Sequence, residues 1–194
     1  STVAFFSAAA AMIPGSNIIL NRILRNPTRI GFYSALYQMG AGMDCLDQWN
    51  EAGEWIGKLN VFHQPLSVIS ITKNDLPGLI DELPIIAIMA TQAEGKTKVH
   101  GAEELRVKEC DRIRAVCENL LAMGGEVIEK KDGFIINQCN TLYNTNIRTY
   151  RDHRIAMSFT VAGLLTDARN TLDDEDCINI SFPEFHKVLT QVMG

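Results

Sequence analysis

Long apolar runs without a polar face are the clearest pattern in this chain. Residues 3–13 and 83–93 are apolar on nearly all sides, with Ala8 to Ala11 in the first run and Ile85 to Ala90 in the second. A helix that is hydrophobic all round is typical of a position buried on every side. The pattern therefore predicts helices at the centre of the fold, and a third is expected over 153–165.

These runs belong to a repeat with a period of roughly 70–80 residues. Each copy reads as a helix, a glycine-containing turn, a strand, a loop and a second helix. The second helices are predicted over 28–39, 111–123 and 184–193, and each is followed by a glycine. Glycine is a common helix stop because it accepts positive φ without strain.

Short β-type stretches lie between the helices. Strands are predicted over 17–23, 55–62, 66–72, 96–100, 126–129, 134–137 and 178–182. The pair Asp132-Gly133 is a hairpin signal between two of them. The elements mix as three βαβαββ-like repeats, which predicts an α/β class and an inside-out α/β domain with buried Ala-rich helices. An ordinary two-layer α/β sandwich is the alternative.

Three charged clusters stand at the starts of helices, at 81–82, 108–112 and 152–154. A helix N-terminus has unpaired N–H groups and the positive end of the helix dipole, so it favours anions. Lys and Arg oppose that dipole, and a fold tolerates them when they face a stronger negative charge. A phosphate or carboxylate ligand is the simplest candidate, so we expect an anion-handling enzyme or part of one.

The middle cluster carries the most varied chemistry. Arg112, in the first turn of its helix, suits bidentate recognition of a phosphate or carboxylate. Lys108 adds a mobile point charge, and Glu109 can carry a proton. The alternative is a surface salt-bridge cluster with little energetic weight.

The other two clusters mix capping residues with candidate ligands. Asp152 is expected to cap its helix, and Arg154 is expected to contact an anion. One of Asp81 and Glu82 can cap the helix that begins near Pro84, which leaves the other for acid–base work.

Composition excludes several classes of protein. The net charge is −5 and no tract is rich in Lys or Arg, which argues against a nucleic-acid partner. No apolar run approaches the roughly 20 residues that span a bilayer. The five cysteines are odd in number and lack CxxC spacing, which favours free thiols and a cytoplasmic location. The histidines lack the spacing of metal ligands.

At these clusters the chain closely resembles the bacterial-type 5-enolpyruvylshikimate-3-phosphate (EPSP) synthase family. The matching stretches are LIDELP at 79–84, ELRVKECDRI at 104–113 and DHRIAM at 152–157, with support from NPTR at 26–29 and SFP at 181–183. The resemblance covers the whole chain but only the C-terminal half of such an enzyme. We therefore expect residues 1–194 to be one domain, cut from a longer polypeptide.

The resemblance implies transfer of the enolpyruvyl group from phosphoenolpyruvate to the 5-hydroxyl of shikimate 3-phosphate. By motif position, Asp81 and Lys108 would contact shikimate 3-phosphate, and Arg112 and Arg154 would bind phosphoenolpyruvate. Asp81 and Glu109 would divide the proton transfers. No cofactor or metal is implied. The missing N-terminal half would complete the site, the full-length protein would be a monomer, and the isolated half would be inactive.

Two positions depart from the family pattern. Cys110 stands where Ser or Thr is usual, which we expect to weaken a helix cap. No Lys lies near Ile180, where some members use one to contact phosphoenolpyruvate.

Two rival interpretations differ in their chemistry. One is UDP-N-acetylglucosamine 1-carboxyvinyltransferase, which performs the same transfer on a sugar nucleotide. The other is a non-catalytic scaffold whose charged clusters are structural ion pairs. A double substitution, Arg112→Ala with Arg154→Ala, is expected to separate a scaffold, which would lose stability, from a site, which would lose only ligand binding.

Overall fold

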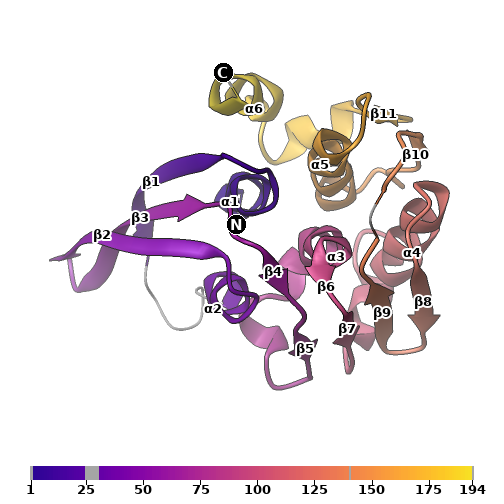
Figure 1. The fold of residues 1–194 in the computed structure, drawn as a ribbon, viewed down its shortest axis with the longest axis horizontal. Coiled ribbons are helices and arrows are strands. Elements are labelled where there is room, and N and C mark those ends of the chain that lie inside the picture. The colour runs from indigo at the N-terminus through magenta and orange to yellow at the C-terminus, as the bar shows by residue number, and fades with distance from the viewer. Residues whose placement is uncertain (1, 25–30, 140, 194) are drawn as a thin grey trace.

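Three helices form the centre of the molecule. The computed structural model describes residues 2–24, 31–139 and 141–193. Helices α1 (Val3–Met12), α3 (Leu83–Thr91) and α5 (His153–Ala162) pack against one another and are seen almost end-on in Figure 1. Every residue of α3 is buried. The prediction of buried, Ala-rich helices in an α/β fold is therefore confirmed.

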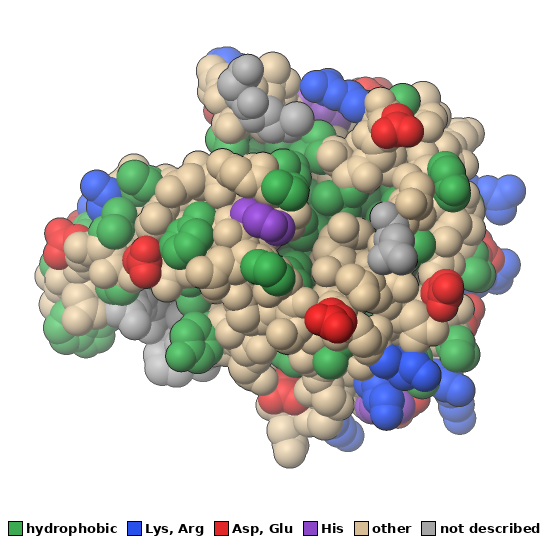
Figure 2. Space-filling model, viewed as in Figure 1, with side chains coloured by type: hydrophobic (Ala, Val, Ile, Leu, Met, Phe, Trp, Pro, Cys, Tyr) green, Lys and Arg blue, Asp and Glu red, His purple; other side chains and the backbone are tan. Residues whose placement is uncertain are grey.

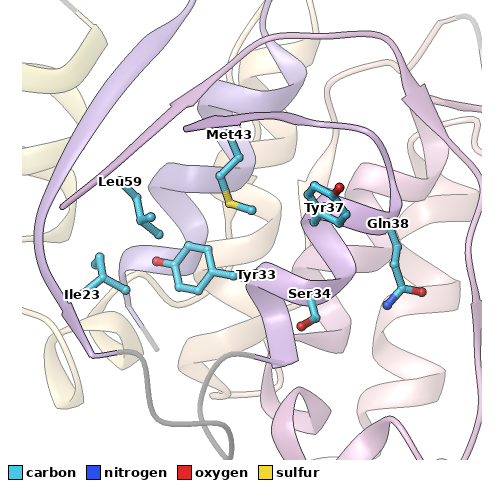
Figure 3. Close-up of a pocket in the computed structure, with 7 residues that line it drawn as sticks. All are labelled: Ile23, Tyr33, Ser34, Tyr37, Gln38, Met43 and Leu59. Carbon is cyan, nitrogen blue, oxygen red and sulfur yellow. The ribbon is translucent and has the colours of Figure 1, made fainter. Parts of the chain in front are cut away.

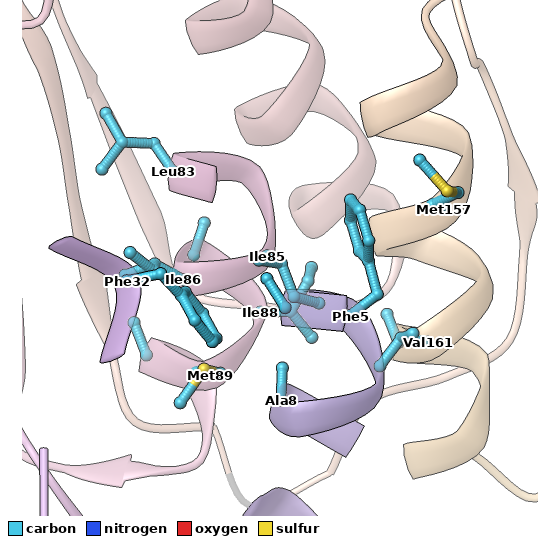
Figure 4. Packing of buried hydrophobic residues seen from close by; sticks show 14 of the residues in the cluster. Phe5, Ala8, Phe32, Leu83, Ile85, Ile86, Ile88, Met89, Met157 and Val161 are labelled. Atoms are coloured by element: carbon cyan, nitrogen blue, oxygen red, sulfur yellow. The ribbon is translucent and has the colours of Figure 1, made fainter. Parts of the chain in front are cut away.

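Large apolar side chains fill the space between these helices. Figure 4 shows Phe5 of α1, Ile85 and Ile88 of α3 and Val161 of α5 gathered in one cluster. Each of the four side chains is at most 1% exposed. Burial of one such side chain contributes roughly 1.5–3 kcal/mol, so this cluster fixes the three helices relative to one another.

A second set of helices covers the central three from outside. It consists of α2 (Gly31–Gln38), α4 (Arg112–Ala122) and α6 (Phe185–Met193). Helix α4 is amphipathic and buries Ile113, Val116 and Leu120. Phe185 of α6 lies edge-on to Phe5 of α1, with ring centroids 6.1 Å apart. The first three residues predicted for α2, at 28–30, lie outside the described residues.

The first sheet protrudes from the body of the molecule (Figure 1). Its strands β1 (Asn17–Leu24), β3 (Glu54–Phe62) and β2 (Gly42–Glu51) are antiparallel, with β3 in the middle. Strand β2 was not predicted, because most of its side chains are exposed and the sequence shows no buried face.

The second sheet lies beside α4. It has the order β5 (Ser70–Ile71), β7 (Lys96–Val99), β9 (Gly133–Asn137) and β8 (Val127–Lys130). The predicted hairpin joins β8 to β9, and its glycine is obligatory: a Cβ at Gly133 would lie 2.0 Å from the Val99 carbonyl oxygen.

The strand predicted over 66–72 is interrupted and serves two sheets. Strand β4 (Leu66–Ser67) pairs with β6 (Ala93–Glu94), whereas β5 pairs with β7. A single continuous strand was therefore the wrong interpretation.

The last third of the chain contains little sheet. Strands β10 (Asn146–Ile147) and β11 (Thr171–Leu172) form a short parallel pair. The strand predicted over 178–182 is wrong, because the chain there forms the 3₁₀ helix Asp176–Ile180. A central helix followed by an outer helix does recur three times, but the strands differ from one copy to the next. The repeat is therefore present in the helices, and the three βαβαββ-like copies stay a prediction as far as the strands are concerned.

The face in Figure 2 carries its hydrophobic and its basic side chains in different places. Hydrophobic side chains gather there over the protruding sheet, and Lys and Arg side chains gather around the β7–β9 region. Among the described residues, no helix combines the length and apolar character needed to cross a membrane.

Candidate active site

Arg112 is the first residue of α4, and its side chain turns into the protein. Asp111 caps this helix by accepting a hydrogen bond from the Arg114 backbone N–H at 3.0 Å. The Arg112 side chain is only 1% exposed. A guanidinium buried to this extent needs charged partners, because an unpaired buried charge is strongly unfavourable.

Asp152 supplies the most deeply buried of these partners. Its Oδ2 accepts a hydrogen bond from Arg112 Nε at 2.8 Å, and its side chain is fully buried. Its Oδ1 also accepts from the backbone N–H groups of Arg154 and Ile155, so Asp152 caps α5 as predicted. One carboxylate therefore fixes the start of α5 relative to the start of α4.

Asp81 bridges the two arginines. Its Oδ1 accepts a hydrogen bond from Arg112 Nη1 at 3.0 Å, and its Oδ2 lies 3.5 Å from Arg154 Nη2. The Asp81 side chain is 43% exposed. This carboxylate is thus held by both guanidinium groups and is still accessible from solvent.

Glu109 and Lys108 differ in their partners. Glu109 Oε2 lies 2.6 Å from Arg112 Nη2, with a side chain that is 51% exposed. Lys108 instead forms an ion pair with Glu104 at 2.7 Å. Among the described residues, no hydrogen bond or ion pair joins Lys108 to Asp81. The structure therefore brings together four of the five predicted site residues and places Lys108 next to them with its own acid.

Glu82 is buried behind Arg154. It occupies the N-cap position of α3, but its side chain makes no capping bond, so the cap that was expected from either Asp81 or Glu82 is not provided by Glu82. Its Oε1 instead accepts a hydrogen bond from Arg154 Nη1 at 3.3 Å, and the Asp81 carbonyl accepts one from the same nitrogen at 3.1 Å. Burial raises the pKa of Glu82, although the positive charge of Arg154 acts to lower it.

These contacts define one unit, which we call the arginine–carboxylate cluster. Its members are Asp81, Glu82, Glu109, Arg112, Asp152 and Arg154. Four carboxylates face two guanidinium groups, so the negative charge that the arginines require is provided by the protein itself. The cations at the helix N-termini therefore do not by themselves require a bound anion.

Cys110 contacts the cluster without capping a helix. Asp111 is the capping residue of α4, so a weakened cap at Cys110 was the wrong expectation. The Cys110 thiol lies 3.6 Å from Asp152 Oδ2. Burial and the nearby Asp152 raise the pKa of Cys110 to about 12, so its thiol is protonated at neutral pH. All five cysteines are free, as predicted.

The backbone before α5 is held in an uncommon conformation. Tyr150 and Arg151 have positive φ values of 54° and 57°. Asp173 Oδ1 accepts hydrogen bonds from the backbone N–H and the hydroxyl of Thr149, at 2.8 Å and 2.7 Å, and the Tyr150 hydroxyl donates to Glu118. This turn sets the position of Asp152, and sequence reasoning gave no indication of it.

A separate groove lies between α2 and the protruding sheet. It has a volume of about 300 Å³ and contains none of the predicted site residues. Figure 3 shows Tyr33 and Tyr37 of α2 on one side, with Ile23, Met43 and Leu59 of the sheet opposite.

The chain has the fold of the enolpyruvyl transferases. The fold matches the enolpyruvyl transferase NikO from Streptomyces tendae with a TM-score of 0.72 over 98% of this chain and 42% of that chain, at 16% identity. A sequence profile of EPSP synthase (3-phosphoshikimate 1-carboxyvinyltransferase) matches residues 1–189. The chain belongs to the EPSP synthase family.

Relatives within the family match over the whole chain. It is 44% identical over 192 residues to 3-phosphoshikimate 1-carboxyvinyltransferase from Sulfurihydrogenibium sp., which covers 99% of this chain and 44% of the relative. The EPSP synthase structure from Acinetobacter baumannii has a TM-score of 0.93 at 35% identity, covering 98% of this chain and 45% of that chain. The chain thus spans less than half the length of the relatives it matches.

Proposed function

We propose that this chain is the C-terminal half of an enzyme that transfers the enolpyruvyl group of phosphoenolpyruvate to the 5-hydroxyl of shikimate 3-phosphate. The observation that carries the proposal is the bridge formed by Asp81 between Arg112 and Arg154, with Glu109 beside it. Family membership over residues 1–189 supports the same reaction. The step belongs to chorismate and aromatic amino-acid biosynthesis.

The proposed reaction is an addition followed by an elimination. In the addition, the 5-hydroxyl oxygen bonds to C2 of phosphoenolpyruvate, the hydroxyl loses its proton, and the methylene carbon gains one. In the elimination, the bond from C2 to the phosphate oxygen breaks and the new methyl group loses a proton. Asp81 and Glu109 are the exposed carboxylates of the cluster, so they are placed to carry these protons. The assignment of each proton to one of the two is left open.

The arginines provide a rigid anion site in this proposal. Arg112 and Arg154 bind phosphoenolpyruvate, and burial of Arg112 fixes the direction of its guanidinium. Because Asp81 and Glu109 already accept bonds from these groups, the substrate must share those donors with the carboxylates. Fixed charges that need no reorganisation stabilise a developing negative charge more effectively than mobile ones.

The rest of the binding site lies outside this half. We propose that Lys108 and Asp81 contact shikimate 3-phosphate and that the N-terminal half supplies its other ligands. The cluster holds four carboxylates and two guanidinium groups, so its carboxylates outnumber its cations. Such a cluster cannot by itself attract a substrate with several negative charges, which supports this division of the site. The complete protein is proposed to be a cytoplasmic monomer without a cofactor, a nucleic-acid partner or a membrane partner.

Phosphate release tests the function. The chain joined to its N-terminal half should release phosphate when both phosphoenolpyruvate and shikimate 3-phosphate are present, and should not do so with either alone. Residues 1–194 alone should show no turnover. Release with UDP-N-acetylglucosamine as the acceptor would favour the rival transferase, and release by the isolated chain would contradict the two-half proposal.

A further inference from the structure

Each arginine of the cluster has at least one exposed and one buried carboxylate partner. Arg112 pairs with exposed Asp81 and Glu109 and with fully buried Asp152. Arg154 pairs with Asp81, which is 43% exposed, and with Glu82, whose side chain is 11% exposed. Each guanidinium group therefore keeps one carboxylate partner that is shielded from solvent.

The exposed carboxylate cannot hold Arg154 throughout the proposed reaction. Asp81 divides its two oxygens between the arginines, and it is accessible from solvent. If Asp81 binds substrate or takes up a proton, its attraction for Arg154 weakens. A second carboxylate that does not take part in the reaction would keep the guanidinium in place.

The surroundings of Glu82 suit that second role. The residue ends the 3₁₀ turn Ile80–Glu82 and immediately precedes α3, so its backbone is fixed by a buried helix. Its side chain lines a cavity of about 190 Å³ whose other described lining residues are mostly apolar or aromatic, with Arg22 as the one cation among them. The apolar and aromatic neighbours disfavour a carboxylate, and Arg154 is the cation that donates a hydrogen bond to it.

We propose that Glu82 is a positioning residue that holds the Arg154 guanidinium for phosphoenolpyruvate independently of the state of Asp81. This inference rests on the proposed function. Glu82 itself touches neither substrate. Its loss should weaken binding of phosphoenolpyruvate, which contacts Arg154, and should leave binding of shikimate 3-phosphate nearly unchanged.

Steady-state kinetics of Glu82→Gln in the two-half protein test this inference. The substitution keeps the size of the side chain and removes its charge. The KM for phosphoenolpyruvate should rise about tenfold, as expected for loss of one charge-assisted hydrogen bond. The KM for shikimate 3-phosphate should change by less than about twofold, and Glu82→Asp should restore part of the loss. Glu184→Gln is the matched control, because Glu184 pairs with Lys187 and, among the described residues, with no residue of the proposed site.

Three outcomes would overturn the inference. One is an unchanged KM for phosphoenolpyruvate in Glu82→Gln. Another is an equal rise in both KM values, which would indicate a general structural role. The third is additivity of the losses in melting temperature. If the loss in the double variant equals the sum of the losses in Glu82→Gln and Arg154→Gln, the two side chains are not coupled.

The melting measurement also separates this inference from the proposed function. If the unaltered two-half protein shows no turnover, the proposed function fails. The double variant still reports whether Glu82 and Arg154 are coupled, because that readout needs no activity. Non-additive melting together with the selective rise in KM supports the full inference.

Discussion

The Asp152 carboxylate and the Arg112 guanidinium form an ion pair at 2.8 Å in which the side chains are 0% and 1% exposed. The two residues begin two different helices and lie 40 positions apart in the sequence. The pair therefore links the start of α4 to the start of α5 inside the protein. Removal of Asp152 takes away the buried partner of Arg112 and leaves it with Asp81 and Glu109, which are both exposed.

Asp152→Ala should be strongly destabilising for this reason. We expect a loss of about 1.5–3 kcal/mol for the charge-assisted bond to Arg112, and a further loss of about 1 kcal/mol for the α5 cap. Asp152→Asn keeps an acceptor for the cap and should lose less. Urea unfolding followed by circular dichroism measures both variants. A loss below about 1 kcal/mol in Asp152→Ala would show that the pair is not what fixes the two helices.

Substitutions at the exposed carboxylates should separate activity from stability. Asp81→Asn and Glu109→Gln should each lower kcat by about 10²–10⁴-fold in the two-half protein, because each removes a candidate acid or base. Their unfolding free energies should change by only about 0–1 kcal/mol, since both side chains are partly exposed. Normal turnover in either variant would remove that residue from the mechanism.

These variants replace the double substitution suggested by the sequence alone. Arg112→Ala with Arg154→Ala was expected to leave a functional site stable. Burial of Arg112 against Asp152 means that this variant should lose stability whether or not the cluster binds substrate. The exposed acids discriminate better than the buried arginines.

The buried Glu82 carboxyl should make stability depend on pH. Its pKa is raised above the ordinary value of 4.5, mainly by burial, so the folded chain holds this proton more tightly than the unfolded chain. The resulting stabilisation is complete below the unfolded pKa and is lost as the pH rises through the folded pKa. Among the described residues, Arg154 opposes the shift and Asp81 reinforces it, and Arg22 lines the same cavity as Glu82.

Melting temperatures of the chain and of Glu82→Gln at several pH values check this sign. Relative to the variant, the unaltered chain should lose stability as the pH rises above about 4.5. Tyr33, whose pKa is raised by burial, titrates far above this range and should not interfere. A relative gain in stability with rising pH would show that Arg154 outweighs burial.

The cysteines should differ in reactivity according to burial. Burial raises the pKa of Cys117 to about 12 and that of Cys177 to about 11, whereas Cys45 is exposed. Because the thiolate is the reactive form, iodoacetamide should label Cys45 at least about tenfold faster than Cys117 in the folded chain. Peptide mapping by mass spectrometry measures the rates, and a urea-unfolded sample provides the control. Equal rates in the folded chain would contradict the packing around α4.

Strong local patterns made most of the helices predictable. Helix α3 is apolar on every side, and α4 shows amphipathic spacing followed by glycine. Strand β2 could not be found in this way, because its exposed side chains give no alternation. The short apolar run at 178–182 led to the opposite error, because a strand was predicted where there is none. The chain there forms a 3₁₀ helix, in which Cys177 and Ile178 are the buried residues.

The residues of the site were predictable from the sequence, but the hydrogen bonds and ion pairs between them were not. The charged clusters identified Asp81, Glu109, Arg112 and Arg154, and the structure brings these four together. The bond between Asp152 and Arg112 was missed, because no local pattern reports a partner 40 residues away. Lys108 was expected to share a ligand with Asp81, and its ion pair with Glu104, four residues earlier in the chain, was not predicted.

The turn before α5 limits how far the chain can be truncated from its C-terminal end. Its two left-handed residues, Tyr150 and Arg151, each cost about 1–2 kcal/mol in backbone strain. The restraint comes partly from Asp173, which lies beyond α5. Truncation before Asp173 would keep every residue of the arginine–carboxylate cluster in the chain. It would also remove the hydrogen bonds from Thr149 to Asp173, which help to hold the strained turn that positions Asp152. The minimal unit for crystallisation or engineering therefore extends past the last residue that contributes to the chemistry.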